Sequence, residues 1–402
     1  MKHTKRLLAL LLSGAMALSL FACGAAGGDP TAYPDADPSA SADPSASADP
    51  SGDPSASPAI VADLSQGVLE FSAGLSAQDV LLTVNGVDVS ADLFLYMLAM
   101  NCMNMQQYLS YFGMTIADVA PTLLDETITM AAYHHLMRQK AAELGCLPTD
   151  AQQEEIRTAL QEADLDSVRP YWGLTDDSAN FIFSITAYYN NVLDATTHEP
   201  SEAELEEYIV SKGAYRVKHI LLKTVDDSRQ PLPEDQIAAK KTQAEDLLAQ
   251  LQSAEDLPAL FDQLMNEYSE DGRTEDGALA APDGYLATPG QMVAEFEEAG
   301  QQLKAGELSG IVETTFGYHI LLGLPLTPFA EGETAEYLES YRPDALEALV
   351  QQWQEQAEIT RAPALETLDT ADFFAKMSAY QQALAEQEEA AGTAPVESGG
   401  VG

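Results

Sequence analysis

Two stretches decide the fold of the central part of this chain: YRVKHILLK at residues 215–223 and LKAGELSGIVETTFGYHILL at residues 303–322. Each carries a histidine, His219 or His319, within a run of apolar residues that is typical of a buried β-strand. The segments between them show helical periodicity or short motifs, at 234–251, 257–267, YSEDG 268–272 and GQMVAEFEEA 290–299. The order of strand, helix, helix, short helix and strand predicts an α+β domain.

These motifs, taken in order, resemble the parvulin family of peptidyl-prolyl isomerases over residues 213–325. The resemblance implies a four-stranded antiparallel sheet flanked by helices, and catalysis of cis–trans rotation about the bond that precedes proline. That rotation faces a barrier of about 18–20 kcal/mol. It breaks no bond to carbon, so we expect an apolar pocket beside a small polar cluster, without a nucleophile, a metal or a cofactor.

Four polar residues match the polar cluster of that family by position. The resemblance implies that His219 and His319 lie on neighbouring central strands and hydrogen-bond to each other. It places Asp271 where the family has Cys or Asp facing the substrate amide, and Thr314 where a threonine supports the histidines. Since the rotation needs no net proton transfer, the histidines can serve to hold the geometry of the site.

Apolar residues around the GQM motif are candidates for the pocket that receives the proline ring. By resemblance, Met292 and Phe296 form its floor, and their spacing of four residues puts both on one face of the predicted helix. The alternative is that both simply pack in the core. Leu279 or Leu286 would supply the third wall, and Ala287 replaces the usual aromatic residue, which predicts a shallower pocket.

We consider three functions for this chain. The intact polar cluster favours an active isomerase that helps exported proteins to fold. Ala287 and the altered loop before the GQM motif favour a holdase chaperone whose isomerase domain is degenerate. A substrate-binding lipoprotein of a transporter would need a long alternation of strands and helices, which the sequence lacks. Arg273 and Lys304 are the only cations between residues 242 and 325, so we expect no preference for phosphorylated substrates.

The first 23 residues have the pattern of a bacterial lipoprotein signal. Cations at positions 2, 5 and 6 precede an apolar run at residues 7–22, which is shorter than the ~20 residues that span a bilayer. The run ends in LFAC, which resembles the lipobox, a motif whose cysteine is acylated after cleavage. We therefore expect residues 1–22 to be a signal peptide and Cys23 to anchor the chain to the outer face of the membrane. The alternative is an ordinary cleaved signal with an incidental cysteine.

Composition separates the folded part from its flanks and excludes one class of partner. Residues 23–64 are rich in Asp, Pro, Ser and Ala, and residues 387–402 are mostly small and acidic, so we expect a disordered tether and a loose tail. The formal net charge is −45, and such a surface repels phosphate backbones, which argues against nucleic-acid binding. The expected partners are unfolded or partly folded exported polypeptides.

Residues 65–212 are predicted to be mainly helical. The signals are, in order, a hairpin turn at Asn85-Gly86, a Met-rich helix after Ser90, a helix at 121–144, and capping boxes at Thr149/Gln152 and Ser201/Glu204. The stretch VNGVDVSADLF at 84–94 resembles the start of the helical chaperone domain of SurA- and PrsA-like foldases. The resemblance implies that helical residues 326–386 pack back on this domain, although a separate helical hairpin is the alternative. The Met-rich helix is either core or an adaptable surface for client proteins.

Two further pairs of residues are predicted to be structural. Cys102 and Cys146 lie in apolar helical surroundings, and we expect both to be buried free thiols. His134 and His135 are adjacent, so they point to different faces of a helix and make a poor metal pair.

Overall fold

The computed structural model describes residues 60–274 and 277–392. Within these ranges the chain forms two compact units. The first, which we call the helical unit, comprises residues 60–196 and 348–392, and the second comprises residues 197–347.

The predicted signal peptide, Cys23 and most of the predicted tether lie outside the described residues. None of the helices in the described ranges combines the length and the hydropathy that a bilayer span requires.

The helical unit contains eight helices and one small sheet within its described residues. The helices are α2 (Val68–Ala73), α3 (Ala91–Tyr111), α4 (Ile116–Glu143), α5 (Asp150–Glu162), α6 (Leu165–Trp172), α7 (Asp176–Thr196), α13 (Pro363–Glu366) and α14 (Thr370–Gly392). The strands are β1 (Val80–Val84), β2 (Val87–Ser90) and β7 (Ile359–Arg361). A further helix, α12 (Ala335–Gln356), begins in the second unit and ends in the helical unit.

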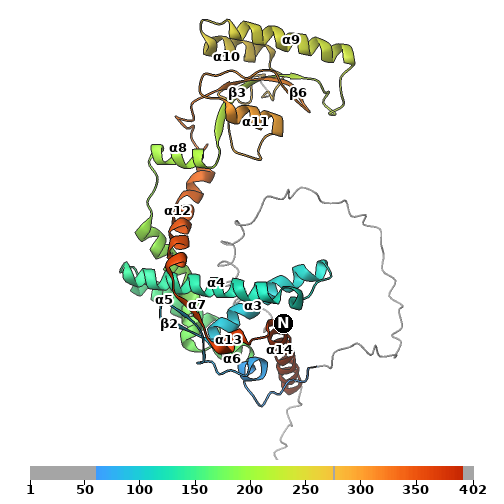
Figure 1. Ribbon diagram of the computed structural model, residues 1–402. Coiled ribbons are helices and arrows are strands. Elements are labelled where there is room, and N and C mark those ends of the chain that lie inside the picture. The colour runs from blue at the N-terminus through green and yellow to red at the C-terminus, as the bar shows by residue number, and fades with distance from the viewer. Residues whose placement is uncertain (1–59, 275–276, 393–402) are drawn as a thin grey trace, which may run out of the picture. The chain divides into compact units, whose positions relative to one another are not determined.

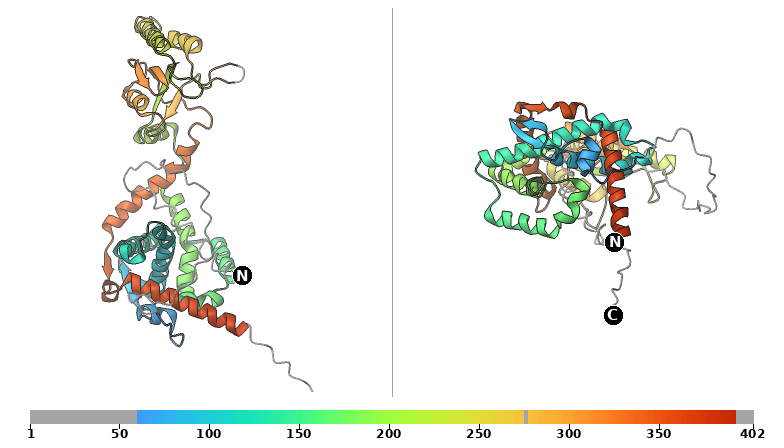
Figure 2. Two further views of the ribbon diagram at one scale, coloured as in Figure 1. Left: turned by 90° about the vertical axis from the view of Figure 1, so that its right-hand side faces the viewer. Right: turned by 90° about the horizontal axis from the view of Figure 1, so that it is seen from below.

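The amino-terminal and carboxyl-terminal parts of the chain build the helical unit together. The strands are ordered β2-β1-β7, so a carboxyl-terminal strand completes the predicted hairpin, and Leu82 pairs with Arg361. The hairpin turn has positive φ angles at Asn85 and Gly86, which these residue types tolerate. Helix α14 packs against α2 and α4 (Figure 2). Both ends of the chain thus form one helical unit, but residues 197–212 and 326–347, which were predicted to belong to it, lie in the second unit.

Helix α4 begins five residues earlier than predicted. Pro121 lies inside the helix, whereas Thr115 and Asp118 form a capping box at its amino terminus. Proline is tolerated near the start of a helix, and here the box, rather than the proline, sets the boundary. The capping boxes predicted at Thr149 and Ser201 are both present.

The Met-rich helix α3 is mainly core. Tyr96, Met97 and Met100 are all buried, which favours the core interpretation for its first half. The exposed large side chains are at its far end, where Tyr108 is 62% and Tyr111 is 85% exposed.

The thiols and the adjacent histidines of the helical unit differ in burial. Cys102 is a buried free thiol, as predicted, but Cys146 is only partly buried. His134 and His135 are both buried, and His135 stacks on Phe181 at 4.6 Å between ring centroids, which supports structural roles.

The predicted carboxyl-terminal tail starts later than residue 387. Helix α14 continues to Gly392, and the Tyr171 hydroxyl donates to the Glu388 carboxylate at 2.9 Å. The assignment of residues 387–392 to a loose tail was therefore wrong, because their Ala- and Glu-rich sequence favours helix and one of them is held by the domain.

The second unit contains the four-stranded antiparallel sheet that was predicted. Its strands are β3 (Tyr215–Lys223), β4 (Tyr285–Ala287), β5 (Val312–Thr314) and β6 (Gly317–Gly323), ordered β4-β3-β6-β5. Its helices, besides α12, are α8 (Glu202–Ser211), α9 (Glu234–Gln252), α10 (Leu257–Tyr268) and α11 (Ala294–Gln302).

The two faces of this sheet have different roles. Helices α9 and α10 cover one face, and α11 covers the other (Figure 1). The α9/α10 face is largely apolar, with Ile220, Leu222 and Ile320 buried against the helices. Because side chains alternate along a strand, the histidines at odd positions of β3 and β6 lie on the α11 face.

Candidate active site

His219 and His319 meet on the α11 face of the sheet. The register pairs His219 with Leu321 and Leu221 with His319, so the two histidines lie on the same face, displaced by two positions. Their Nδ1 atoms are 3.0 Å apart, and the rings are parallel within 11°. Both side chains are buried. The predicted contact between the two histidines is therefore present.

Asp271 and Thr314 lie at opposite ends of this histidine pair. Asp271 Oδ2 is 3.0 Å from His219 Nε2, and Thr314 Oγ1 is 2.8 Å from His319 Nε2. A tight turn brings Thr314 close, because Gly317 has a φ of +147° and a Cβ there would lie 2.1 Å from the Leu222 carbonyl oxygen. The four residues that the sequence singled out thus form one continuous hydrogen-bonded chain.

One assignment of protons satisfies the whole chain when both rings are neutral and the carboxyl is ionised. Asp271 accepts from His219 Nε2–H, so His219 Nδ1 must accept from His319 Nδ1–H. His319 Nε2 then accepts from the Thr314 hydroxyl, whose oxygen accepts from the Phe316 backbone N–H at 3.1 Å. Each donor has one acceptor, so the chain holds both rings in fixed tautomers.

The surroundings of His319 and Asp271 favour these protonation states. Burial, together with the neighbouring His219, lowers the pKa of His319 to about 3, so its ring is neutral at pH 7. Burial alone would raise the pKa of Asp271, but hydrogen bonds from His219 and Tyr285 outweigh that effect and hold it well below its usual range. The site therefore carries a negative charge at Asp271, and the His319 ring is neutral.

Apolar side chains lie against the histidines. The Phe296 ring is buried and meets both imidazoles edge-on, with centroid distances of 5.1 Å to His219 and 5.4 Å to His319. Met292 and Val312, both partly buried, pack against the same cluster, which also includes Leu321. The geometry provides an apolar floor directly beside the polar chain.

Met292 reaches this cluster by a route that differs from the predicted one. Helix α11 begins at Ala294, so Met292 lies in the preceding turn rather than on a shared helix face with Phe296. Gly290 has a φ of +89°, and its N–H donates to the Glu297 side chain at 2.7 Å, which holds the turn against the helix. The two residues are together, but the helical spacing argument was wrong.

Comparisons with known proteins agree with this geometry. Residues 219–323 match the family described as rotamase, PPIC-type PPIase domain. The foldase protein PrsA of Geobacillus kaustophilus is 38% identical over 123 residues, which are 30% of this chain and 35% of that protein. The foldase protein PrsA of Caldanaerobacter subterraneus is 28% identical over 253 residues, which are 55% of this chain and 79% of that protein. Residues 219–323 therefore form a parvulin-type domain, and the chain as a whole is similar to PrsA foldases. A crystal structure of the peptidyl-prolyl isomerase PrsA from Bacillus cereus aligns with 75% of this chain and 99% of its own at 19% identity, but its TM-score of 0.27 supports no conclusion.

The structure places the two candidates for the third pocket wall away from the histidines. Leu279 is buried in the cluster of Ile220, Leu222 and the α9/α10 helices, on the opposite side of the sheet. Leu286 pairs with Arg216 on β3, and this register turns it away from the face of its neighbour Tyr285. The assignment of Leu279 to the proline pocket was therefore wrong, because its apolar side chain fills the core beneath the sheet.

Ala287 lies on the site face of the parvulin-type domain and is fully buried beside Tyr215 and Phe296. A methyl group therefore occupies the position where the resemblance implies an aromatic ring.

Tyr285 was not identified from the sequence, although it contacts the polar chain directly. Its hydroxyl donates to Asp271 Oδ2 at 2.6 Å, and its ring lies edge-on to His219 at 5.6 Å. Burial and the hydrogen bond to ionised Asp271 raise its pKa, so the hydroxyl keeps its proton. The turn signal Pro282-Asp283-Gly284 predicts that a strand follows, but the pairing of that strand with β3 is a tertiary feature.

The cation nearest to this site in sequence has a structural role. Arg273 donates to the backbone carbonyl oxygens of Asn266, Ser269 and Gly277, at distances of 2.8–3.2 Å. Its guanidinium therefore holds its own loop.

Proposed function

We propose that this chain is an active peptidyl-prolyl cis–trans isomerase that assists the folding of exported proteins. The observation that carries the proposal is the buried chain Asp271–His219–His319–Thr314, which lies against Phe296 and Met292. We further propose that the polar chain and the two apolar residues bind the substrate, with the proline ring on the apolar floor. Residues 219–323 supply the class of activity, because they match the isomerase domain family.

The rotation needs an environment that favours the twisted amide over its two planar forms. The twisted amide has lost its resonance and is less polar than the planar forms, so burial against Phe296 and Met292 favours it. The hydrogen-bonded histidines hold Asp271 in place, so little reorganisation is needed when the amide rotates. The residues of this chain therefore bind and orient the amide, and none of them must give up or accept a proton overall.

The proposed location is the outer face of the membrane. The apolar run at residues 7–22 and Cys23 in LFAC support a lipid anchor, and the Asp- and Pro-rich residues 23–64 support a spacer between the anchor and the folded units. The proposed partners are unfolded or partly folded exported polypeptides, which the helical unit would bind.

A refolding experiment with the full chain tests the proposal as a whole. The substrate is a model protein whose slow refolding phase is a prolyl isomerisation, and aggregation of the same protein is followed by light scattering. We expect the chain to accelerate the slow phase, and we expect Phe296→Ala to abolish the acceleration while leaving protection from aggregation intact. Protection without acceleration by the wild-type chain would contradict the isomerase function and leave a holdase.

A further inference from the structure

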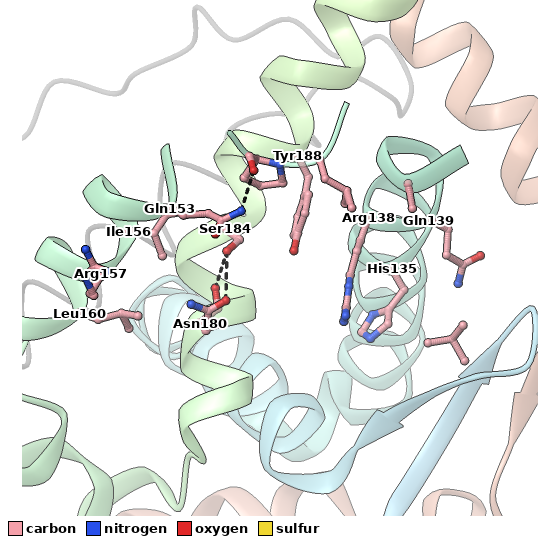
Figure 3. Close-up of a pocket in the computed structure, with 14 residues that line it drawn as sticks. His135, Arg138, Gln139, Gln153, Ile156, Arg157, Leu160, Asn180, Ser184 and Tyr188 are labelled. Atoms are coloured by element: carbon pink, nitrogen blue, oxygen red, sulfur yellow. Dashed lines mark hydrogen bonds between the residues drawn. The ribbon is translucent and has the colours of Figure 1, made fainter. Parts of the chain in front are cut away.

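A groove of about 610 Å³ opens in the helical unit between α4, α5 and α7 (Figure 3). This volume is within the range of about 300–1,000 Å³ that is typical of ligand sites. Its walls are largely apolar, with Leu147, Ile156, Leu160 and the ring of Tyr188 among the lining residues. No part of the proposed isomerase site contributes to it, because every residue that lines it belongs to the range 87–188.

The groove lacks carboxylates in a chain that is crowded with them. The sequence has 64 acidic residues against 19 basic ones, yet none of the 14 residues that line the groove is acidic. Arg138 and Arg157 are among those 14 residues. The groove is therefore a local exception to the negative charge of the chain, and it favours an anionic ligand.

Arg138 is the cation that this groove leaves available. The described part of the helical unit contains six Lys and Arg residues, and five of them are in ion pairs: Lys140, Arg157, Arg169, Arg361 and Lys376. Within the same described ranges, Arg138 has no carboxylate at ion-pair distance and instead lies over the Phe181 ring, 5.9 Å from its centroid. Because the sequence has more than three carboxylates per cation, an arginine without a carboxylate partner is available to bind an anionic group of another molecule.

The rim of the groove is held in place by the protein's own hydrogen bonds. The Gln139 side chain donates to the Val84 carbonyl oxygen at 2.9 Å, and the Gln153 side chain donates to the Pro148 carbonyl oxygen at 2.8 Å. Asn180 accepts a hydrogen bond from Ser184, which leaves its side-chain N–H groups available (Figure 3). A preformed rim with free amide and guanidinium donors suits the backbone carbonyls and carboxylates of a peptide.

We propose that this groove binds an extended peptide segment in which an acidic side chain neighbours a large apolar one. The carboxylate would pair with Arg138, and the apolar side chain would pack on Ile156 and Tyr188. Its role in the cell rests on the proposed foldase function, since such segments would come from client polypeptides. Binding itself needs no isomerisation and can be measured independently.

Fluorescence anisotropy with labelled nonapeptides and the full chain tests this proposal. Three proline-free peptides alternate Leu with Glu, Gln or Lys, so they differ in charge but share apolar content and cannot be isomerase substrates. We expect the Glu peptide to bind about tenfold more tightly than the Gln peptide, a difference of about 1.4 kcal/mol, and the Lys peptide to bind more weakly still. Arg138→Gln should remove the preference for Glu over Gln.

Two variants separate charge and apolar contributions. Lys376→Gln makes the same charge change on α14, away from the groove, and should leave all three affinities unchanged. Leu147→Gln changes an apolar side chain that is 49% exposed, so it should not unfold the domain, and it should weaken the Glu and Gln peptides alike. The circular dichroism spectrum of each variant checks that the fold is kept.

Three results would overturn the proposal. They are equal binding of the Glu, Gln and Lys peptides to the wild-type chain, a preference for Glu that survives in Arg138→Gln, and undiminished binding of a Glu peptide whose leucines are all replaced by serine. The last result would show a plain anion site. Isomerisation of a short Xaa-Pro peptide, measured on the same preparations, should not differ between Arg138→Gln and wild type. The peptide-binding proposal and the isomerase proposal can thus be refuted independently.

Discussion

Tyr285→Phe removes a single hydroxyl from the polar chain and tests whether that chain acts as a unit. The lost bond is the 2.6 Å donation to Asp271 Oδ2, whereas the edge contact of the ring with His219 remains. Hydrogen bonds to charged groups contribute about 1.5–3 kcal/mol. The Asp271 side chain is 26% exposed, so water can replace part of that bond. We therefore expect a loss of about 1 kcal/mol, or about fivefold in kcat/KM for a Xaa-Pro peptide.

The direction of the pKa change provides a second readout. Because the Tyr285 hydrogen bond lowers the pKa of Asp271, its removal should raise that pKa, which can be followed by NMR of the Asp271 carboxyl carbon. The tautomers of His219 should be unchanged, since His219 still donates to Asp271. Tyr318→Phe is the matched control, because Tyr318 is buried in the cluster on the opposite face of the sheet.

A double-mutant cycle decides whether Tyr285 acts through Asp271. If it does, Tyr285→Phe should change kcat/KM less than twofold in a chain that already carries Asp271→Asn. An equal fivefold loss in both backgrounds would refute a positioning role. Wild-type activity in Tyr285→Phe would refute any contribution of the hydrogen bond.

Three further predictions concern stability. Phe296→Ala should lower the free energy of unfolding of the second unit by about 3–5 kcal/mol in urea titrations, because the buried ring packs against the histidines. A loss below about 1 kcal/mol would contradict the position of the Phe296 ring in the core. Arg216→Gln should lower the free energy of unfolding by about 2–3 kcal/mol in the same titrations, because Arg216 is largely buried and binds Glu333 through two 2.7 Å hydrogen bonds. An unchanged unfolding midpoint would show that this ion pair does not contribute to stability. Stability should fall as the pH falls from about 6.5 toward 3, because the pKa of His319 is about 3 in the folded state against 6.5 in the unfolded state, so the unfolded state binds more protons in that window. This one residue contributes at most about 1.4 kcal/mol per pH unit to the slope of the free energy of unfolding against pH. His319→Gln should therefore show a flatter pH dependence than the wild-type chain, and an equal slope in both would contradict the prediction.

Local sequence signals predicted the elements of the fold well. The alternation around His219, the capping boxes at Thr149 and Ser201, and the Asn85-Gly86 turn each reflect short-range physics, and each appears in the structure. The start of α4 was missed because Pro121 is a conspicuous residue, whereas the Thr115 box that sets the boundary was overlooked.

The parts of the site that depend on register were not accessible from the sequence. Whether a leucine of the loop before β4 lies above or below the sheet depends on how β4 pairs with β3, and Leu279 lies on the side opposite to the expected one. The contact of Tyr285 with Asp271 was not predicted for the same reason, since it joins a strand to a loop 14 residues away. His219 and His319 could be paired across 100 residues only because the resemblance supplied the register that periodicity alone does not contain.

The most direct test of the central claim is the rate of cis-to-trans relaxation of short Xaa-Pro peptides. Uncatalysed, this relaxation takes tens of seconds or more at 25 °C. With the full chain added, the account predicts a rate that rises in proportion to protein concentration, and a loss of that dependence in Phe296→Ala. A relaxation rate equal to that in buffer at every protein concentration would contradict the claim that the chain Asp271–His219–His319–Thr314 belongs to a working isomerase.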